Sequence, residues 1–467
     1  MSWNLKEIYK ALNKKFNHSE NIEFQKISID SRKISSEDFF IPIEGENYDG
    51  HNFIDDVSNF GVKACLVERK KGFLVRNCSI HKIFVRNTQQ SLQELASYAR
   101  KRNKNLNMIC ITGSSGKTSL KEWTGKILNE KVNTYINPGN FNNEIGMPLS
   151  LVNMPLSTKV CILELGMNRK GEIKKLTKIS SPTISVITNI GLAHIGNFEK
   201  PKDIAKEKAS IYNYLNKKSF ALIPNDSEYS KLLARKASLK TQNIISFGVK
   251  GKSDASFRRI NENKFVFSIL RKKISLEKKD YFNHWEENTL IVLIILNILK
   301  YNFNDFRKKI ENLKPLKGRG EKVKIFKNKK SFFLIDESYN SSPHTLKHSI
   351  INAKNILKNN QKLVLVIGDM LELGKFSEEL HLSISETVKN VSPKLLVTVG
   401  SFSKKIAENL KNDIKVFHYK TYNSVYERLI EEIDDNDIVM IKGSNSINLS
   451  KICERLKKKI ILCFTTF

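Results

Sequence analysis

The chain has 467 residues, 40% of them hydrophobic, and a formal net charge of +31 from 79 Lys and Arg against 48 Asp and Glu. At about 150 residues per domain, this length predicts roughly three domains with real cores. The charge indicates an anionic partner or compositional drift. Because the lysines are scattered and no zinc-finger spacing or aromatic RNA-binding signature is present, we favour compositional drift together with an anionic substrate, and we expect no nucleic acid.

The N-terminal residues 1–16 have the pattern of an amphipathic helix and lack an apolar signal core. The longest apolar run, residues 290–299, is shorter than the roughly 20 residues that cross a bilayer, so it predicts a buried helix. Six cysteines form no Cys-x-x-Cys pair, and Cys110 and Cys161 lie in apolar runs, which is typical of reduced, buried thiols. These features predict a cytoplasmic protein without stable membrane insertion.

Residues 27–54 form a turn-rich segment that predicts a small mixed αβ domain. Short β-branched runs, each followed by a helical pattern, then predict βα units on parallel sheets in two further αβ domains. A basic polar stretch at 99–107 and the Pro and Gly of 313–323 separate these parts. The runs are residues 108–112, 160–165, 183–190, 331–336, 362–370, 394–400 and 437–444.

The segment TGSSGKTS, residues 112–119, departs from the usual phosphate loop, which has Gly, four residues, then Gly-Lys-Ser/Thr. Ile111 stands where the first glycine belongs, and Gly113 comes two residues later. The context of strand, turn and helix start nevertheless favours phosphate binding over an ordinary Gly/Ser turn, because backbone N–H groups and a helix N-terminus attract anions. Lys117 would reach the terminal phosphates, and the Thr118 hydroxyl could bind Mg²⁺.

Two polar residues follow buried strands of the same domain, where ligands of open αβ sheets bind. Glu164 ends one apolar run, and His194 follows another. Each alone could be a surface residue or a satisfied core group. Two such residues after a phosphate loop favour a metal site, and the Asn- and Gly-rich segment 137–150 could hold a polar ligand.

Several motifs resemble the Mur ligases, ADP-forming amide ligases of peptidoglycan precursor synthesis. TGSSGKTS, GNFNNEIGMPLS, ELGMN and TNIGLAHIGNF are similar to the central ATPase domain of that family, whose loop has the short form Thr-Gly-x-x-Gly-Lys-Thr. IDSRKISSEDFFIPIEGENYDGHNFI resembles the UDP-sugar-binding segment. IDESYNSSPHTL and VIGDMLELGKFSEELH resemble the type that adds D-alanyl-D-alanine, and the Asp-Asn-Pro-Arg motif of relatives that add diaminopimelate or lysine is absent.

The resemblance implies three α/β domains: a small mixed αβ UDP-sugar-binding domain at 1–104, a central P-loop ATP-binding domain with a mostly parallel sheet at 105–314, and a Rossmann-like domain for the incoming dipeptide at 315–467. It implies catalytic roles for Lys117, His194 and Lys208. The expected ATP-binding residues are Gly113, Ser114, Ser115, Gly116, Lys117, Thr118, Ser119, Asn288, Arg319 and Asp336. The expected substrate-binding residues are Ser31, Arg32, Gly45, His51, Asn142, Asn143, Tyr339 and Asn340. The expected ligands of two Mg²⁺ ions are Thr118, Glu164, His194 and Lys208, the last as a carbamate.

The chain departs from the family pattern around both implied pockets. In the adenine-binding motif, Phe282 and Trp285 replace the usual Gly and Asn that flank His284. In the dipeptide region, Glu337 replaces an Asp, and the other departures are Ser341, Ser342 and Asn445.

The implied reaction joins D-alanyl-D-alanine to UDP-N-acetylmuramoyl-tripeptide through an acyl phosphate. It would serve peptidoglycan synthesis, and with it cell shape and division, in a monomer that closes about residues 316–322. The third residue of the tripeptide, lysine or diaminopimelate, is left open. The alternatives are a tripeptide-forming Mur ligase or folylpolyglutamate synthase, against which GDMLELG argues, a basic nucleic-acid-dependent P-loop NTPase, and a binding protein whose site has decayed.

Overall fold

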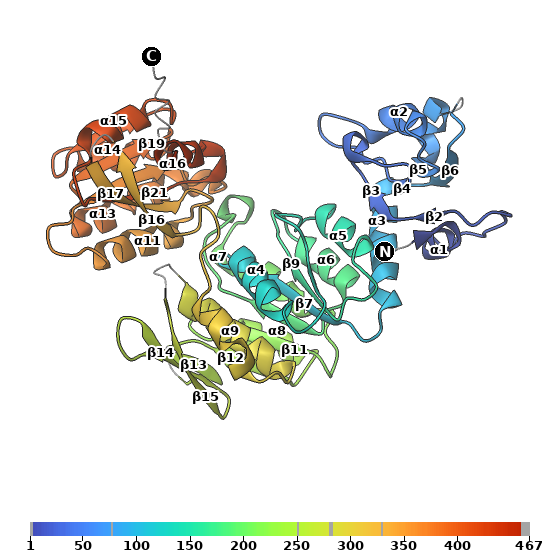
Figure 1. Ribbon diagram of the computed structural model, residues 1–467, viewed down its shortest axis with the longest axis horizontal. Coiled ribbons are helices and arrows are strands. Elements are labelled where there is room, and N and C mark those ends of the chain that lie inside the picture. Colours follow the sequence, from blue (N-terminus) through green and yellow to red (C-terminus); the bar gives the residue numbers. More distant parts are fainter. Residues whose placement is uncertain (1–2, 76–77, 250–251, 280–283, 328–329, 459–467) are drawn as a thin grey trace, which may run out of the picture. The chain divides into compact units, whose positions relative to one another are not determined.

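The computed structural model describes residues 3–75, 78–249, 252–279, 284–327 and 330–458 (Figure 1). The chain separates into two compact units. The first unit comprises residues 1–113, 120–188 and 205–246, and the second comprises 114–119, 189–204 and 247–467. Each unit is α/β, as the sequence predicts, and the domain boundaries at 104 and 314 stay a prediction.

The N-terminal part of the first unit is built on a parallel sheet in the order β3-β4-β5-β6. Its core includes Phe40, Val57 and Val67. The helix expected over residues 1–16 is shorter, because strand β1 precedes it and Asn13 adopts a left-handed φ of 52° just after it. The elements are β1 (Trp3–Asn4), α1 (Leu5–Ala11), β2 (Glu23–Phe24), β3 (Lys26–Ser28), β4 (Asp38–Phe40), α2 (Ile54–Asn59), β5 (Ala64–Glu68), β6 (His81–Val85) and α3 (Thr88–Arg102).

Within the described residues, six neighbouring strands of a nine-stranded sheet have the order β12-β11-β10-β7-β9-β8. Strands β7, β9 and β10 pair in parallel and are almost wholly buried, which confirms the runs predicted at 108–112, 160–165 and 183–190. The strands are β7 (Asn107–Thr112), β8 (Thr134–Ile136), β9 (Val160–Glu164), β10 (Ile184–Ile187), β11 (Phe220–Pro224) and β12 (Ile244–Phe247). The helices of this part of the chain are α4 (Lys117–Leu128), α5 (Gly146–Val152), α6 (Glu172–Ser180), α7 (Pro201–Ala209) and α8 (Ser230–Ser238).

The second unit contains an antiparallel ribbon, β13 (Ala255–Arg259), β14 (Lys264–Ile269) and β15 (Lys272–Glu277), against which helix α9 (Trp285–Ile298) packs. Residues 285 and 288–296 of α9 are buried, so the apolar run forms a core helix, as predicted. Within the described ranges, no helix combines the length and the apolar character needed to span a bilayer. The connecting elements are the 3-10 helix η6 (Phe303–Phe306) and α10 (Arg307–Glu311).

The C-terminal sheet of the second unit has the order β16-β17-β21-β18-β19-β20 and is parallel except for the β16–β17 pair. Helices cover both faces (Figure 1), as expected of a Rossmann-like domain. The strands are β16 (Glu321–Lys327), β17 (Lys330–Glu337), β18 (Leu363–Gly368), β19 (Leu395–Val399), β20 (Val416–Tyr419) and β21 (Ile438–Lys442). The helices are α11 (Pro343–Asn355), α12 (Ser377–Leu382), α13 (Ser385–Val391), α14 (Lys404–Leu410), α15 (Val425–Glu432) and α16 (Ser450–Lys457).

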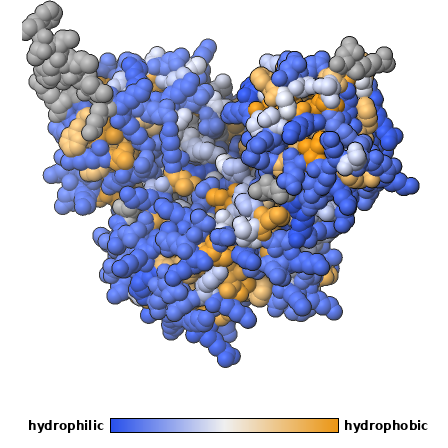
Figure 2. Space-filling model, turned by 45° about the vertical axis from the view of Figure 1, so that its right-hand side comes forward, coloured by the Kyte–Doolittle hydropathy of each residue, from blue (hydrophilic) through white to orange (hydrophobic). Residues whose placement is uncertain are grey.

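Most of the described cysteines are buried, and the surface visible in Figure 2 is mainly hydrophilic. Cys110 and Cys161 are buried and unpaired in β7 and β9, as predicted, and burial raises the pKa of Cys110 to about 12. Cys463 lies outside the described residues. The face drawn in Figure 2 is mainly hydrophilic, in keeping with the excess of lysine.

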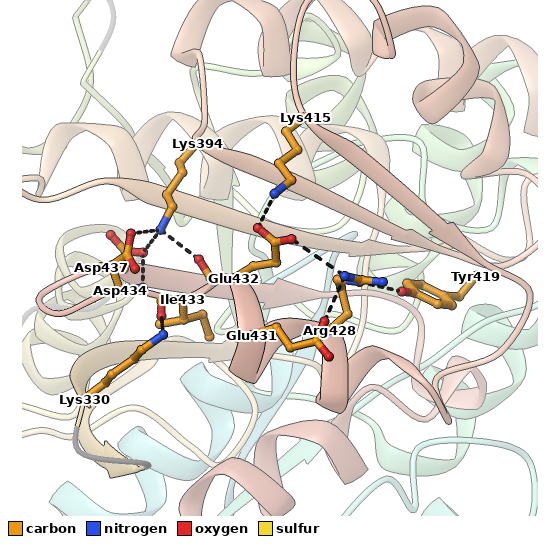
Figure 3. A network of polar contacts seen from close by, with 10 residues as sticks. All are labelled: Lys330, Lys394, Lys415, Tyr419, Arg428, Glu431, Glu432, Ile433, Asp434 and Asp437. Atoms are coloured by element: carbon orange, nitrogen blue, oxygen red, sulfur yellow. Dashed lines mark hydrogen bonds and ion pairs between the residues drawn. The ribbon is translucent and has the colours of Figure 1, made fainter.

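Lys394 joins the beginning of β19 to the loop between α15 and β21 (Figure 3). Its Nζ donates hydrogen bonds to the Glu432 carbonyl oxygen at 2.8 Å, Asp434 Oδ2 at 2.6 Å and Asp437 Oδ2 at 2.8 Å. Asp437 is almost fully buried, and Lys394 supplies the cation that offsets the negative charge of its carboxylate.

We expect Lys394→Met to lower the free energy of unfolding by about 2 kcal/mol or more, because it leaves the buried Asp437 carboxylate without its cation. Urea unfolding of the full chain, followed by circular dichroism, measures this loss. Lys389→Met is the matched control, because the Lys389–Asp413 pair is exposed and should contribute less than about 1 kcal/mol. Equal losses in both variants would contradict the assignment.

Candidate active site

The phosphate loop follows β7 and leads into α4 without a break. Ile111 is buried inside the strand, so the turn begins only at residue 113. Gly113 and Gly116 have φ values of 151° and 79°, a region that residues with side chains rarely adopt. The glycines therefore stand where the shortened turn needs them, which explains why position 111 is not glycine.

In the first unit, Thr188 and Lys208 contact the start of this loop. The Thr188 amide donates to the Thr112 carbonyl oxygen at 2.9 Å, and a Cβ on Gly113 would lie 1.9 Å from Thr188 Oγ1. Lys208 on α7 is 1% exposed, and its Nζ donates to the Gly113 carbonyl oxygen at 3.0 Å. The lysine that the resemblance selects is thus buried beside the phosphate loop and is not one of the many solvated lysines.

In the second unit, Asn189 holds the middle of the loop. Its Oδ1 accepts from the Ser114 and Ser115 amides at 3.2 and 2.9 Å, and its Nδ2 donates to Ser115 Oγ at 2.7 Å. Ser114 Oγ also donates to the Gly191 carbonyl oxygen at 3.0 Å. Sequence reasoning missed Asn189, although it lies in the TNIG segment. Its position after β10, at the same sheet edge as the loop, was the available signal.

Within the second unit, further predicted site residues lie beside Thr118 and Gly116. Arg319 Nη2 donates to Thr118 Oγ1 at 3.0 Å, and its guanidinium lies 4.0 Å from the centre of the Tyr339 ring. Asn288, at the beginning of α9, is 3% exposed, and its Oδ1 would lie 3.4 Å from a Cβ on Gly116. The structure therefore brings Gly116, Thr118, Asn288, Arg319 and Tyr339 together.

Asp336 and Asn340 are engaged by lysines that sequence reasoning did not select. Asp336 is 2% exposed, and its Oδ2 accepts from Lys457 Nζ at 2.8 Å. Burial raises the pKa of Asp336, but the hydrogen bonds from Lys457 and Ser338 outweigh it and lower that pKa below its ordinary value. The Asn340 carbonyl oxygen accepts from Lys442 Nζ at 3.0 Å.

The dipeptide-region departure Glu337 also has a partner. Burial raises its pKa, but the charge of Lys442, 2.9 Å away, and a hydrogen bond from Ser349 outweigh it and lower that pKa. The pair neutralises a charge that would otherwise be costly to bury.

Glu164 ends β9 in the first unit and is 3% exposed. Its Oε1 accepts from Asn142 Nδ2 at 2.8 Å. Asn143 instead uses its Oδ1 to accept from the amides of Ile145 and Gly146 at the start of α5. Of the two predicted substrate-binding asparagines, Asn142 thus orients the Glu164 carboxylate, whereas Asn143 binds backbone amides where α5 begins.

His194 lies beside a loop of the C-terminal sheet that carries the GDMLELG motif. Its Nδ1 is 2.7 Å from Oε2 of Glu372, and this contact lowers the pKa of Glu372. The backbones also meet, because the Gly196 amide donates to the Glu372 carbonyl oxygen at 2.9 Å. A Cβ on Gly196 would lie 2.5 Å from the Gly374 amide nitrogen, so only glycine fits. Glu372 is a partner of His194 that sequence reasoning missed.

The residues expected to bind the UDP end lie in the N-terminal part of the first unit. Ser31 and Arg32 form a 3-10 turn, and exposed Arg32 pairs with Asp30 at 2.8 Å. Gly45 donates its amide to the Tyr48 carbonyl oxygen at 2.8 Å. His51 is 1% exposed, with Nδ1 2.7 Å from Asp49 Oδ1 and Nε2 accepting from the Glu68 amide at 3.2 Å. His51 therefore holds the loop in place through both ring nitrogens.

Asp49 gives this loop a pH dependence. Partial burial raises the pKa of Asp49, but hydrogen bonds from Lys71 and His51 outweigh it and lower the pKa to about 2. An unfolded Asp has a pKa of about 3.9. The stabilisation is therefore present above about pH 4 and is lost as the pH falls from 4 toward 2.

We expect Asp49→Asn to lower stability by about 1 kcal/mol near neutral pH and to remove part of the acid sensitivity, since solvent screening limits the effect. Calorimetry of the full chain from pH 6 to pH 3 measures it. Asp55→Asn, at an exposed position on α2, is the control. A constant difference between wild type and Asp49→Asn across this pH range would contradict the assignment.

The oxygen donors suit Mg²⁺ carried by a nucleotide. Mg²⁺ prefers carboxylate and hydroxyl oxygens, and it usually keeps several waters and phosphate oxygens with only one or two protein ligands. In the first unit, Glu164 fits that pattern as a buried carboxylate held by an amide. In the second unit, Thr118 fits it as a hydroxyl at the start of a helix. No group of three or more His, Cys, Asp or Glu side chains within the described ranges could form an all-protein cage.

Family models match three successive parts of the chain. The model described as "Mur ligase family, catalytic domain" matches residues 23–100, "Mur ligase middle domain" matches 111–296, and "Mur ligase, glutamate ligase domain" matches 318–445. A protein of Rickettsia prowazekii named UDP-N-acetylmuramoyl-tripeptide–D-alanyl-D-alanine ligase is 30% identical over 459 residues, which cover 97% of this chain and 99% of that protein. The chain belongs to the Mur ligase family.

Solved structures of Mur ligases resemble this chain over nearly its whole fold. A structure of MurF from Acinetobacter baumannii matches with a TM-score of 0.86 and 26% identity, covering 98% of this chain and 99% of that one. MurF ligase from Thermotoga maritima in complex with ADP matches with a TM-score of 0.77 and 25% identity, covering 92% and 96%. The predicted three-domain Mur ligase architecture is thereby confirmed.

Proposed function

We propose that this chain joins D-alanyl-D-alanine to UDP-N-acetylmuramoyl-tripeptide, with hydrolysis of ATP to ADP and phosphate. One observation carries the proposal: the likeness to a ligase named for this reaction extends over 97% of the chain. The shortened phosphate loop with Lys117 at the beginning of α4 supports the use of ATP. So does the ADP complex of the Thermotoga maritima relative.

The chemistry begins with the tripeptide carboxylate, which is a poor acyl donor. It attacks the γ-phosphate of ATP in line, forming an acyl phosphate and releasing ADP. The amine of the dipeptide then attacks the acyl carbon and loses a proton, and phosphate leaves as the amide bond forms. Lys117 offsets negative charge on the transferring phosphoryl group, as a preorganised cation does in such sites.

The other predicted residues have these roles. Gly113 to Ser119, Asn288, Arg319 and Asp336 bind the nucleotide. Ser31, Arg32, Gly45 and His51 serve the UDP end. Asn142, Asn143, Tyr339 and Asn340 are the other proposed substrate-binding residues. Thr118, Glu164, His194 and a carbamylated Lys208 would hold Mg²⁺, which when bound supplies positive charge to the phosphates. We further propose a cytoplasmic monomer whose product is used in building the cell wall, and so in cell shape and division.

A substrate-omission assay tests the proposal. Purified protein with ATP and Mg²⁺ should release phosphate only when both UDP-N-acetylmuramoyl-tripeptide and D-alanyl-D-alanine are present. Release that needs the tripeptide but ignores the dipeptide would refute the proposed acceptor. Release stimulated by nucleic acid instead would favour the alternative NTPase.

A further inference from the structure

Helix α4 buries a lysine one turn after the phosphate-loop residues that begin it. Lys121 is 0% exposed and lies on the helix face that also buries Leu120, Thr124 and Leu128. An apolar residue is the usual occupant of such a position, because a buried ammonium group is costly unless every proton finds an acceptor. In sequence, Lys121 is indistinguishable from the many other lysines of the chain.

The Lys121 ammonium group holds one loop. Its Nζ donates to the carbonyl oxygens of Asn137 at 2.6 Å and Gly139 at 3.0 Å. It also lies 3.0 Å from Oε1 of Glu122. Three oxygens match the three protons of an ammonium group, so this lysine is fully engaged within the protein.

The same loop holds Glu164 at both backbone and side chain. Asn137, which is fully buried, accepts from the Glu164 amide through Oδ1 at 2.9 Å and donates to the Glu164 carbonyl oxygen through Nδ2 at 3.3 Å. Asn142 donates to Glu164 Oε1, and its own carbonyl oxygen accepts from the Gly166 amide at 2.8 Å. The loop is therefore bound to Lys121 on one side and to Glu164 on the other.

We propose that Lys121 is a positioning residue for Glu164, acting through residues 137–142. Lys121 holds the carbonyl oxygens of Asn137 and Gly139 in place. It thereby positions the loop that carries the Asn142 side-chain amide, and this amide orients the Glu164 carboxylate. Outer partners of this kind typically change metal affinity by about ten- to a hundredfold. The inference rests on the proposed role of Glu164 as a ligand of nucleotide-bound Mg²⁺.

The test uses Mn²⁺ as a spectroscopic substitute for Mg²⁺, titrated by electron paramagnetic resonance against the full chain with a non-hydrolysable ATP analogue. Lys121→Met, which keeps an unbranched side chain but removes the ammonium group, should weaken Mn²⁺ binding about tenfold or more. Lys126→Met, at an exposed position on the same helix, should bind as wild type does. A folded Lys121→Met protein with wild-type Mn²⁺ affinity would overturn the proposal.

A double-mutant cycle tests the route. If Lys121 acts through the loop, Lys121→Met and Asn142→Ala together should weaken Mn²⁺ binding little more than the stronger single variant. Fully additive losses would overturn the route. If Lys121→Met does not fold, Lys121→Arg replaces it, since the larger guanidinium cannot sit in the same way on the two carbonyl oxygens, and the same weakening is expected. Glu164→Gln tests the underlying site separately, because wild-type Mn²⁺ affinity in that variant would refute the metal role of Glu164 itself.

Discussion

Lys117→Ala is expected to lower kcat for dipeptide-dependent phosphate release by about 10²–10³-fold. Lys117 is the first residue of α4, directly after the loop Gly113–Gly116, where the helix N-terminus favours phosphate. Its removal takes away the cation that offsets charge on the transferring phosphoryl group. Because the side chain is only partly buried, the fold should be unaffected.

The control for Lys117→Ala is a substitution of another lysine on the same helix that lies outside the site. Lys126 is exposed on α4, and Lys126→Ala should leave kcat within about twofold of wild type. Steady-state phosphate release and circular dichroism measure activity and fold in the same samples. Near-normal kcat in Lys117→Ala would show that the loop does not bind the γ-phosphate of ATP.

Gly113→Ala should abolish most of the activity for a steric reason. The new Cβ would lie 1.9 Å from Thr188 Oγ1 and would place a side chain at a φ of 151°. The loop must then move away from β10, and a displacement of about 1 Å in a positioned group can cost 10²-fold in rate. We expect kcat to fall at least about 10²-fold, with a stability loss of about 1–3 kcal/mol from overpacking.

Two further variants separate the clash from the backbone strain. Gly61 in the N-terminal part has a φ of 83°, but a Cβ there meets only Ser36 Cβ at 3.4 Å. Gly61→Ala should therefore cost about 1 kcal/mol of stability and leave kcat unchanged. Adding Thr188→Ala to Gly113→Ala removes the overlapping oxygen and should restore part of kcat. No recovery in the double variant would show that strain, and not the contact with Thr188, causes the loss.

The central strands of the two larger sheets could be predicted because they are buried on both faces, whereas β8 and β20, which are only partly buried, are not among the predicted runs. A strand that is buried on both faces appears in the sequence as a nearly continuous apolar run, rich in β-branched residues, and β7, β9 and β19 are examples. The phosphate loop could be predicted for a similar reason, since its chemistry lies in consecutive residues. The limits of α1 could not be predicted, because the alternation of apolar and polar residues does not show where the left-handed turn at Asn13 occurs.

The partners of the site residues could not be predicted, because each is brought into place by the fold. Asn189, Glu372 and Lys457 lie about 75, 178 and 121 residues from the groups they hold, and none has a local pattern that sets it apart. Lys121 is the extreme case, since only its burial distinguishes it from its neighbours.

The central claim is the identity of the acceptor, and mass spectrometry of the product tests it most directly. The protein is incubated with ATP, Mg²⁺ and UDP-N-acetylmuramoyl-tripeptide, and D-alanyl-D-alanine, lysine, diaminopimelate and glutamate are offered in separate reactions. We predict a product extended by two alanine residues with D-alanyl-D-alanine and no product with the other acceptors. Extension by any of the single amino acids, with none by the dipeptide, would contradict the proposed function.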